Sequence, residues 1–185
     1  MTLPNLEKPK IEWDISSKIL VTHDVLSDTE CEDIIRFGET NVRPGVNKYA
    51  HVFSTKFDSC LLPLNHAAHD MLKTAWQNVQ VYFDFALDFI EPYELKKYYP
   101  ECHFGKHVDN YYGLTQSLDR KVTLSVQLTH PTEYEGGAFN VLGRKYKLPK
   151  GSIIAFPSFF THEIEPITTG TRWSLIGWAW GPYWR

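Results

Sequence analysis

The chain has 185 residues, a length typical of one domain, since domains usually contain roughly 100–200 residues. Hydrophobic residues make up 43% and charged residues 22%, values that exclude a disordered, collagen-like or coiled-coil protein. The net charge is −3, and no cluster of Lys and Arg could neutralise several phosphates, so we expect no nucleic-acid partner. The aromatic content of 15% is typical of a strand-rich domain.

The cysteines and the apolar segments predict the compartment. The three cysteines (Cys31, Cys60 and Cys102) are odd in number and far apart, and no CxxC motif occurs, which favours a reducing compartment over a disulfide framework. The first residues lack the apolar core of a signal peptide, and the longest apolar segments are far shorter than the ~18 residues of a spanning helix. We therefore expect a cytoplasmic protein without a membrane partner.

The first helix is predicted by the segment LSDTECEDIIRFGE. Ser27 or Asp28 can cap this helix, and Glu30 lies three residues after Ser27, which is the capping-box spacing. Ahead of the helix, residues 1–14 predict a tail and residues 18–23 a short strand. The chain therefore enters the domain through a strand followed by a capped helix.

A second helix and a series of strands follow. Residues 41–62 predict a loop with short strand pieces, and Pro63 begins a helix, roughly 64–80, whose apolar residues recur near the 3.6-residue period. From about residue 81, β-rich segments alternate with turn signals. Many short strands at this spacing predict a barrel or a sandwich. These segments are YFDFALDFI, ELKKYY, KVTLSVQLT, GGAFNVL, RKYKL, GSIIAFP, THEIEPI and RWSLIGWAW.

The expected fold class is α+β, mainly β. Residues 1–85, approximately, form the helical support and the first strands, and residues 86–181, approximately, form a jelly-roll core. All residues from 1 to 185 then belong to a single domain, a β-barrel backed by the N-terminal helices.

The segment HFGKHVDNYYG contains the first candidate metal ligands. His107 and Asp109 are two residues apart, and residues at this spacing share one face of an extended strand. His162 follows 53 residues later in SFFTHEIEP. Two His and one carboxylate form the facial triad of non-haem Fe(II) oxygenases, which leaves open positions for substrate and O2. A His-x-Asp pair alone occurs often by chance, so a polar network without metal is the alternative.

Arg172 is the candidate residue for an anionic cosubstrate. It lies ten residues after His162, and an antiparallel hairpin of residues 160–165 with 171–179 would turn its side chain toward that histidine. A guanidinium matches a carboxylate in a two-point contact. An iron site beside such a cation suggests a dicarboxylate cosubstrate that chelates iron at one end.

With these residues in place, the sequence resembles the 2-oxoglutarate- and Fe(II)-dependent dioxygenases of the prolyl 4-hydroxylase-like group, from about Leu26 to Trp178. The order and spacing of several segments carry the resemblance together. They are LSDTECEDII, Tyr98 and Phe104 ahead of the first His, HVDN, RKVT at 120–123, Glu135-Gly136-Gly137, KLPKGSIIAFPS and THEIEPITTGTRW. The family often has Gly where Glu101 stands and Tyr where Gln127 stands.

The resemblance implies a role for each matching residue. His107, Asp109 and His162 bind Fe(II), and Arg172 pairs with the distal carboxylate of 2-oxoglutarate. Further residues contact the cosubstrate or line its pocket: Tyr98, Thr123, Gln127 and Trp178. The implied fold is a double-stranded β-helix, and Tyr98, Phe104 and Trp178 are expected to line a water-poor iron pocket.

The implied reaction is hydroxylation of a prolyl residue in a peptide or protein, with O2 as the oxidant and succinate and CO2 as coproducts. Ascorbate is a further expected cofactor. The alternatives are the same chemistry on a lysyl side chain, a free amino acid or another small molecule, a dioxygenase without 2-oxoglutarate, and a binding relative without activity. Because halogenating relatives lack the carboxylate ligand, Asp109 argues against halogenation.

Several other residues are weaker candidates. His66 and His69 have a spacing that could bind metal, but no third ligand is evident, so a surface helix is expected. His103 is interpreted as a residue at the rim of the site. The loops around 43–57 and 110–118 are candidates to cover its mouth.

Overall fold

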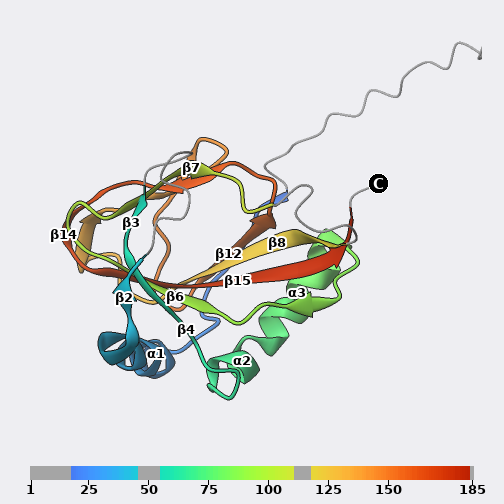
Figure 1. The fold of residues 1–185 in the computed structure, drawn as a ribbon, viewed down its shortest axis with the longest axis horizontal. Helices are drawn as coiled ribbons and strands as arrows, with labels where there is room; N and C mark the ends of the chain where they lie inside the picture. The colour runs from blue at the N-terminus through green and yellow to red at the C-terminus, as the bar shows by residue number, and fades with distance from the viewer. Residues whose placement is uncertain (1–17, 46–54, 111–117, 184–185) are drawn as a thin grey trace, which may run out of the picture.

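The computed structural model describes residues 18–45, 55–110 and 118–183 (Figure 1). The predicted tail at 1–14 lies outside the described residues, and so do the central parts of both expected mouth loops, 46–54 and 111–117. The helices are α1 (Asp28–Asn41), α2 (Ala68–Met71) and α3 (Lys73–Phe83). In the described ranges, none of these helices combines the length and the apolar composition that crossing a bilayer requires.

Helix α1 begins with the predicted capping box. The N–H of Glu30 donates to Ser27 Oγ at 3.3 Å, and the N–H of Ser27 donates to the Glu30 carboxylate at 2.7 Å. The helix buries Cys31, Ile34 and Gly38. A side chain at Gly38 would lie 2.5 Å from the Trp173 ring, so the glycine lets α1 approach the sheet closely.

The second helix differs from the prediction of one continuous helix over 64–80. Residues 64–67 form turns, and a break at Leu72 separates α2 from α3. Helix α3 then continues to Phe83 and ends at Asp84, whose backbone is left-handed (φ 54°). The start of YFDFALDFI is therefore helical and not a strand, because Phe83 continues the buried face that Val79 belongs to.

Most strands belong to two antiparallel sheets. The eight-stranded sheet has the order β1-β12-β8-β15-β6-β4-β2, with β5 added beside β15. Its strands are β1 (Leu20–Thr22), β2 (Arg43–Pro44), β4 (Asp58–Leu61), β5 (Phe89–Ile90), β6 (Glu94–Tyr98), β8 (Leu118–Gln127), β12 (Ile153–Pro157) and β15 (Arg172–Pro182).

The five-stranded sheet has the order β11-β10-β13-β7-β3. Its strands are β3 (Thr55–Lys56), β7 (His103–His107), β10 (Phe139–Val141), β11 (Arg144–Tyr146) and β13 (His162–Ile164). A separate pair joins β9 (Tyr134–Gly136) to β14 (Ile167–Gly170). The chain is thus mainly β with added helices, as predicted.

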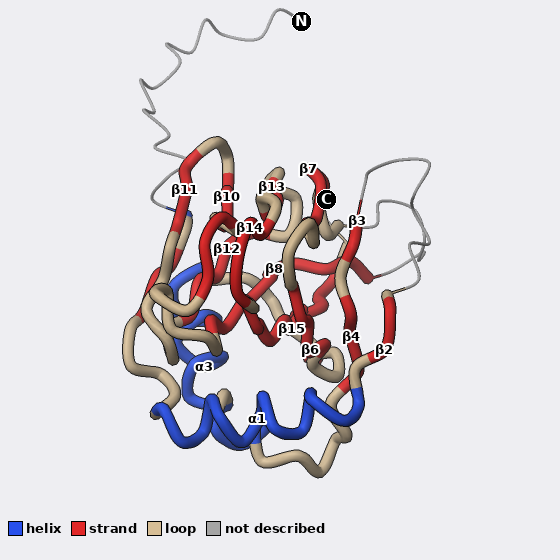
Figure 2. Tube along the Cα trace, turned by 90° about the vertical axis from the view of Figure 1, so that its left-hand side faces the viewer, coloured by secondary structure: helices blue, strands red, loops and turns tan. Residues whose placement is uncertain are grey.

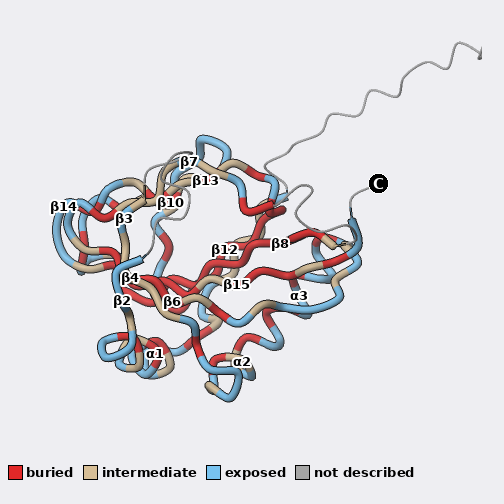
Figure 3. Tube along the Cα trace, in the orientation of Figure 1, coloured by how far each residue is buried: buried red, intermediate tan, exposed pale blue. Residues whose placement is uncertain are grey.

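Two apolar clusters lie on opposite faces of the large sheet. On one face Leu124 and Leu175 pack with Ile34 of α1 and Val79 of α3. On the other face, side chains of the large sheet pack with side chains of the small sheet: Tyr98, Ile154 and Phe156 with Phe139, Val141 and Ile164. Figures 1 and 2 show the helices on one side of β6 and β15, and β7 and β13 on the other. Both faces are covered, so β8 is buried along almost its whole length (Figure 3).

The predicted hairpin of 160–165 with 171–179 is wrong. Strand β13 pairs with β7 and β10, whereas β15 pairs with β6 and β8 of the other sheet. Strand β14 lies between them in sequence and pairs with β9, so the chain crosses from one sheet to the other instead of folding back on itself. Arg172 accordingly lies opposite Tyr98 of β6.

Candidate metal centre

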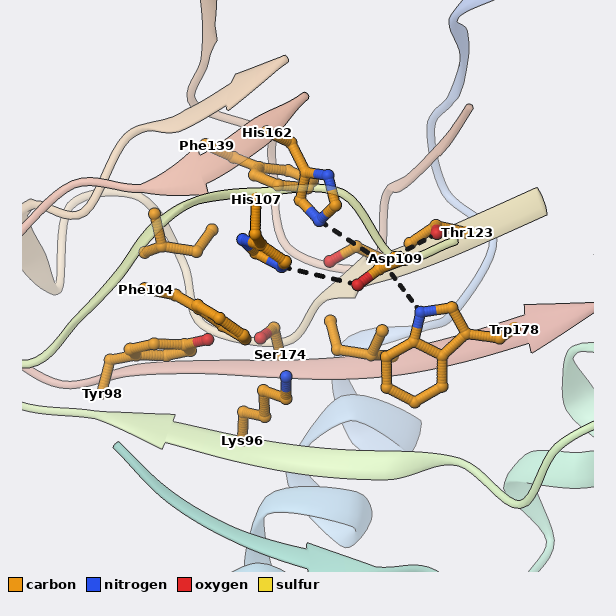
Figure 4. A pocket seen from close by; sticks show the side chains of 13 residues that line it. Lys96, Tyr98, Phe104, His107, Asp109, Thr123, Phe139, His162, Ser174 and Trp178 are labelled. Atoms are coloured by element: carbon orange, nitrogen blue, oxygen red, sulfur yellow. Dashed lines mark hydrogen bonds and ion pairs between the residues drawn. The ribbon is translucent and has the colours of Figure 1, made fainter. Parts of the chain in front are cut away.

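Three of the predicted site residues meet between the two sheets. His107 ends β7 and His162 begins β13, and the two residues are directly paired in the small sheet. Asp109 follows two residues after His107, and one ligand atom from each residue lies within 4.8 Å of the others. The Asp109 carboxylate oxygens are 3.5 Å from His107 Nε2 and 3.4 Å from His162 Nε2 (Figure 4). Among the described residues this is the sole such group.

Asp109 reaches this position by a different route from the one the sequence suggested. Strand β7 ends at His107, so strand alternation does not extend to Asp109. Instead the N–H of Asp109 donates to the carbonyl oxygen of Ser158 at 2.9 Å. This hydrogen bond ties the residue to the end of β12 and turns its carboxylate toward the two imidazoles.

The backbone orients both imidazole rings. His107 Nδ1 is 2.7 Å from the carbonyl oxygen of Gly105, and His162 Nδ1 is 3.0 Å from that of Phe160. A carbonyl oxygen can only accept, so Nδ1 carries the proton in each contact and Nε2 keeps its lone pair. This is the tautomer that a metal-binding histidine needs, with the second nitrogen held by a fixed acceptor.

The Asp109 carboxylate has its own supporting hydrogen bonds. Thr123 Oγ1 and Trp178 Nε1 both donate to Oδ2, each at 2.8 Å (Figure 4). Burial raises the pKa of Asp109, but in the metal-free protein the two imidazoles outweigh it, by charge and by hydrogen bonds, whenever their Nε2 atoms are protonated, and that pKa lies well below its ordinary value. Burial lowers the pKa of His107. The carboxylate is therefore ionised and His107 neutral, the protonation states that metal coordination requires.

A cavity of about 30 Å³ adjoins the triad. This volume holds roughly one or two water molecules. Its wall includes three predicted pocket residues of the large sheet, Tyr98, Thr123 and Trp178, together with Phe104 of the small sheet. The Phe104 ring stacks on His107 with centroids 3.9 Å apart. The Phe104 and Trp178 side chains thus contact the triad directly.

Arg172 and Gln127 lie beside this cavity and are not part of its wall. Arg172 is buried, its Nε donates to Gln127 Oε1 at 3.1 Å, and its guanidinium carbon is 5.7 Å from the Tyr98 ring centroid. Within the described ranges, Arg172 Nη1 and Ser174 Oγ are buried without a hydrogen-bond partner. Unsatisfied buried donors of this kind are costly, so they indicate a site for an acceptor that the protein does not itself provide.

The sequence alone did not single out Lys96 and Ser174, which also line the cavity. Each stands two residues along a strand from a predicted residue, Lys96 from Tyr98 and Ser174 from Arg172. Strand alternation places such residues on the same face, so it could have identified both. The other lining residues that were missed are Ser125, Phe139, Ile164 and Ile176.

The other histidines of the described ranges do not join the triad. The His69 ring lies 4.7 Å from the ring of Tyr93, and the His66 ring lies 5.3 Å from that of Phe37. His103 is at the far end of β7 from His107, and its Nδ1 contacts the carbonyl oxygen of Glu101. The His-Asp-His set is therefore the metal-ligating group that the described residues offer.

Two antiparallel sheets with a His-Asp-His group between them define the class of protein, a β-sheet protein with three side chains that could hold a metal ion. Residues 93–180 match the model of the 2OG-Fe(II) oxygenase superfamily. The match confirms, for this segment, the resemblance seen in the sequence.

Curated relatives include PKHD-type hydroxylases. The protein from Crocosphaera subtropica is 36% identical over 95 residues, which are 49% of this chain and 43% of the relative. The protein from Aliarcobacter butzleri is 32% identical over 130 residues, which are 64% of this chain and 55% of the relative. The chain thus spans about half the length of the curated relatives it matches.

Solved structures with a similar fold include two prolyl hydroxylases. The viral collagen prolyl hydroxylase from Paramecium Bursaria Chlorella virus-1 has a TM-score of 0.71 and 20% identity, covering 89% of this chain and 96% of its own. The prolyl-4-hydroxylase from Pseudomonas putida has a TM-score of 0.66 and 17% identity, covering 88% and 91%. At these identities the likeness shows the fold alone.

Proposed function

We propose that the protein is an Fe(II)- and 2-oxoglutarate-dependent dioxygenase that hydroxylates a prolyl residue in a peptide or protein. One oxygen atom of O2 enters the C–H bond, and the other enters the succinate that 2-oxoglutarate forms as it loses CO2. The observation that carries the proposal is the convergence of His107, Asp109 and His162 within 4.8 Å. Two imidazole nitrogens and one carboxylate oxygen are the ligands of a non-haem Fe(II) oxygenase.

The same ligand set explains how the site would hold iron. Nε2 of His107 and of His162 would bind the metal together with Asp109 Oδ1, since the hydrogen bonds that the Thr123 and Trp178 side chains donate both reach Oδ2. These two side chains would keep the carboxylate oriented. When bound, Fe(II) and 2-oxoglutarate together supply the reduction of O2 and the oxidation of the C–H bond.

The distal carboxylate of 2-oxoglutarate would be bound by Arg172 and Ser174. The unpartnered Nη1 and Oγ of these residues are buried donors, and their positions two apart on β15 place them on one face. Gln127 would hold the guanidinium in place through its bond to Nε. Tyr98, whose ring lies beside that guanidinium, would form the wall of this end of the site.

Three further parts of the proposal concern the whole chain. Residues 1–185 would act as one domain, with about 1–85 as support and about 86–181 as core. The two facing sheets would be the halves of a double-stranded β-helix backed by the N-terminal helices, which the similarity to the solved hydroxylases supports. Ascorbate as a further cofactor and the cytoplasmic location stay predictions.

The test is turnover with proline-rich peptides in the presence of Fe(II), 2-oxoglutarate and O2. We expect succinate in proportion to a product heavier by one oxygen atom. His107→Ala should abolish both, whereas His130→Ala, an exposed histidine outside the triad, should leave both unchanged. If the iron-loaded protein turns over no proline-containing peptide or protein, the prolyl substrate is wrong. If it binds no iron, the oxygenase assignment is wrong.

A further inference from the structure

Lys96 is a buried cation inside the cavity. It stands in the middle of β6 and is only 5% exposed. Its neighbours Leu95 and Lys97 point to the opposite face of the sheet, where Trp173 belongs to the apolar cluster that packs against the helices. Figure 4 shows the Lys96 side chain rising from β6 toward the cavity that the three ligand residues line from the other side. A lysine is almost never buried in this way unless it is paired.

The ammonium of Lys96 keeps hydrogen-bonding capacity toward the cavity. Its ion-pair partner among the described residues is Glu94, at 3.4 Å, and an ammonium has three N–H donors. The rings of Phe57 and Phe104 lie 4.7 Å and 4.6 Å from Nζ. Aromatic faces stabilise a cation but replace a carboxylate or a water only in part. An acceptor that enters the cavity would therefore gain a charge-assisted bond from Nζ.

The cosubstrate does not need this cation. Its distal carboxylate has the buried donors of Arg172 and Ser174, and its other end belongs at the ligand triad. Lys96 is thus a second positive charge, besides Arg172, on the face of the large sheet that the small sheet covers. The cavity of about 30 Å³ has room for roughly one or two water molecules, so an organic group that enters it displaces them or shifts a lining side chain. Lys96 has four rotatable side-chain bonds, whereas most of the other wall side chains are short, β-branched or aromatic.

We propose that Lys96 binds a carboxylate of the substrate, and this inference rests on the proposed function. The enzyme would then favour a prolyl residue that carries or adjoins a carboxylate. Two sources offer this group: the α-carboxylate of a terminal proline and the side chain of an Asp or Glu next to the target. The contact with Glu94 is long, at 3.4 Å, and the Glu94 side chain is partly solvated, so the ammonium can also bind one substrate carboxylate, but it would leave the second charge of a phosphate uncompensated.

The experiment compares matched peptides in the wild-type protein and in two Lys96 variants. Each carboxylate peptide has an uncharged partner: Asp against Asn beside the proline, and a free C-terminal proline against its amide. In Lys96→Met we expect the KM of the preferred carboxylate peptide to rise about 10- to 100-fold, the range of a charge-assisted hydrogen bond. The KM of its neutral partner and that of the cosubstrate should stay unchanged, and Lys96→Arg should recover most of the loss.

Lys97→Met is the matched control. This lysine is the next residue of the same strand, but its Nζ lies over the Trp173 ring and 3.0 Å from Glu39. The variant should retain the wild-type preference for the carboxylate peptide. Which of the two peptide pairs shows the preference identifies the source of the carboxylate.

Two results would overturn the inference. One is a wild-type enzyme that uses carboxylate and neutral peptides equally well, a comparison that requires no variant. The other is a Lys96→Met variant in which only the cosubstrate KM rises, because Lys96 would then serve 2-oxoglutarate. If the wild-type enzyme hydroxylates no prolyl compound, the proposed function fails instead. The role of Lys96 is then tested with non-prolyl carboxylates and their amides. The measured quantity is the rate of 2-oxoglutarate decarboxylation that each compound stimulates.

Discussion

The two faces of the large sheet are built by the same strands but carry different chemistry. On β8, Val122, Leu124 and Val126 face the helices, and the alternating Thr123 and Ser125 face the cavity. Both sets are buried to nearly the same extent. On a strand with one face in water, such alternation would only place the polar residues in solvent. Here the small sheet covers the polar residues, so they line a buried cavity, and Thr123 hydrogen-bonds Asp109.

The face of the large sheet that packs against the helices, here called the outer face, should determine the stability of the fold. Leu124 is fully buried against the helix-side cluster, so Leu124→Ala removes buried volume without touching the triad. We expect the free energy of unfolding to fall by about 2–5 kcal/mol. Urea unfolding measures this loss, and metal titration of the folded variant should give the wild-type affinity. A large loss of metal affinity at full stability would contradict the division between the faces.

The face toward the cavity, here called the inner face, should determine metal binding. Thr123, the neighbour of Leu124 on β8, allows a matched substitution on this face. Thr123→Val keeps the branched shape but removes the hydroxyl that donates to Asp109 Oδ2. Loss of such an outer hydrogen bond should weaken metal affinity about 10- to 100-fold. Anaerobic titration with Fe(II) measures the change. A variant that binds iron normally and unfolds as easily as Leu124→Ala would show that the two faces are alike.

The cavity should also make the metal-free protein sensitive to acid. Burial lowers the pKa of His107 in the folded state, so the unfolded state binds that proton more tightly. The stability contributed by neutral His107 is present above the unfolded pKa of about 6.5 and declines as the pH falls below it. The depressed pKa of Asp109 adds a loss at still lower pH, below about 4.

Unfolding of the metal-free protein by urea at a series of pH values measures this dependence. His107→Gln should flatten the decline near pH 6.5, whereas Leu124→Ala should lower the whole curve without changing its slope. If the free energy of unfolding declines as steeply in His107→Gln as in the wild type, the decline belongs to another titrating group.

The smallest expected effect concerns the positioning of Arg172. Gln127→Ala removes the acceptor of Arg172 Nε but leaves the guanidinium in place. We expect the cosubstrate KM to rise about three- to tenfold, because the cation remains and only its orientation suffers. Steady-state kinetics with varied 2-oxoglutarate at saturating peptide measure this KM, and an unchanged peptide KM separates the role of Gln127 from that of Lys96. A value equal to wild type would mean that Gln127 has no positioning role.

Local signals in the sequence were sufficient for the first helix and for most strands. The Ser27–Glu30 capping box is formed as predicted, because its two partners are three residues apart and need no distant contact. The second helix was predicted with the wrong limits. Its break at Leu72 and its extension to Phe83 depend on packing against the sheet, which the helical period does not specify.

The sequence by itself determined the residue types of the candidate site: two imidazoles, one carboxylate and one guanidinium at family-like spacing. Only the tertiary structure decided how they meet. The pairing of His107 with His162 joins strands far apart in the chain, and Asp109 is turned inward by the carbonyl of Ser158. Arg172 reaches Tyr98 across the large sheet and not through the expected hairpin. Such contacts depend on which strands become neighbours. Strand alternation could have placed Lys96 on the same face as Tyr98, but its burial follows only from the sheet that covers that face.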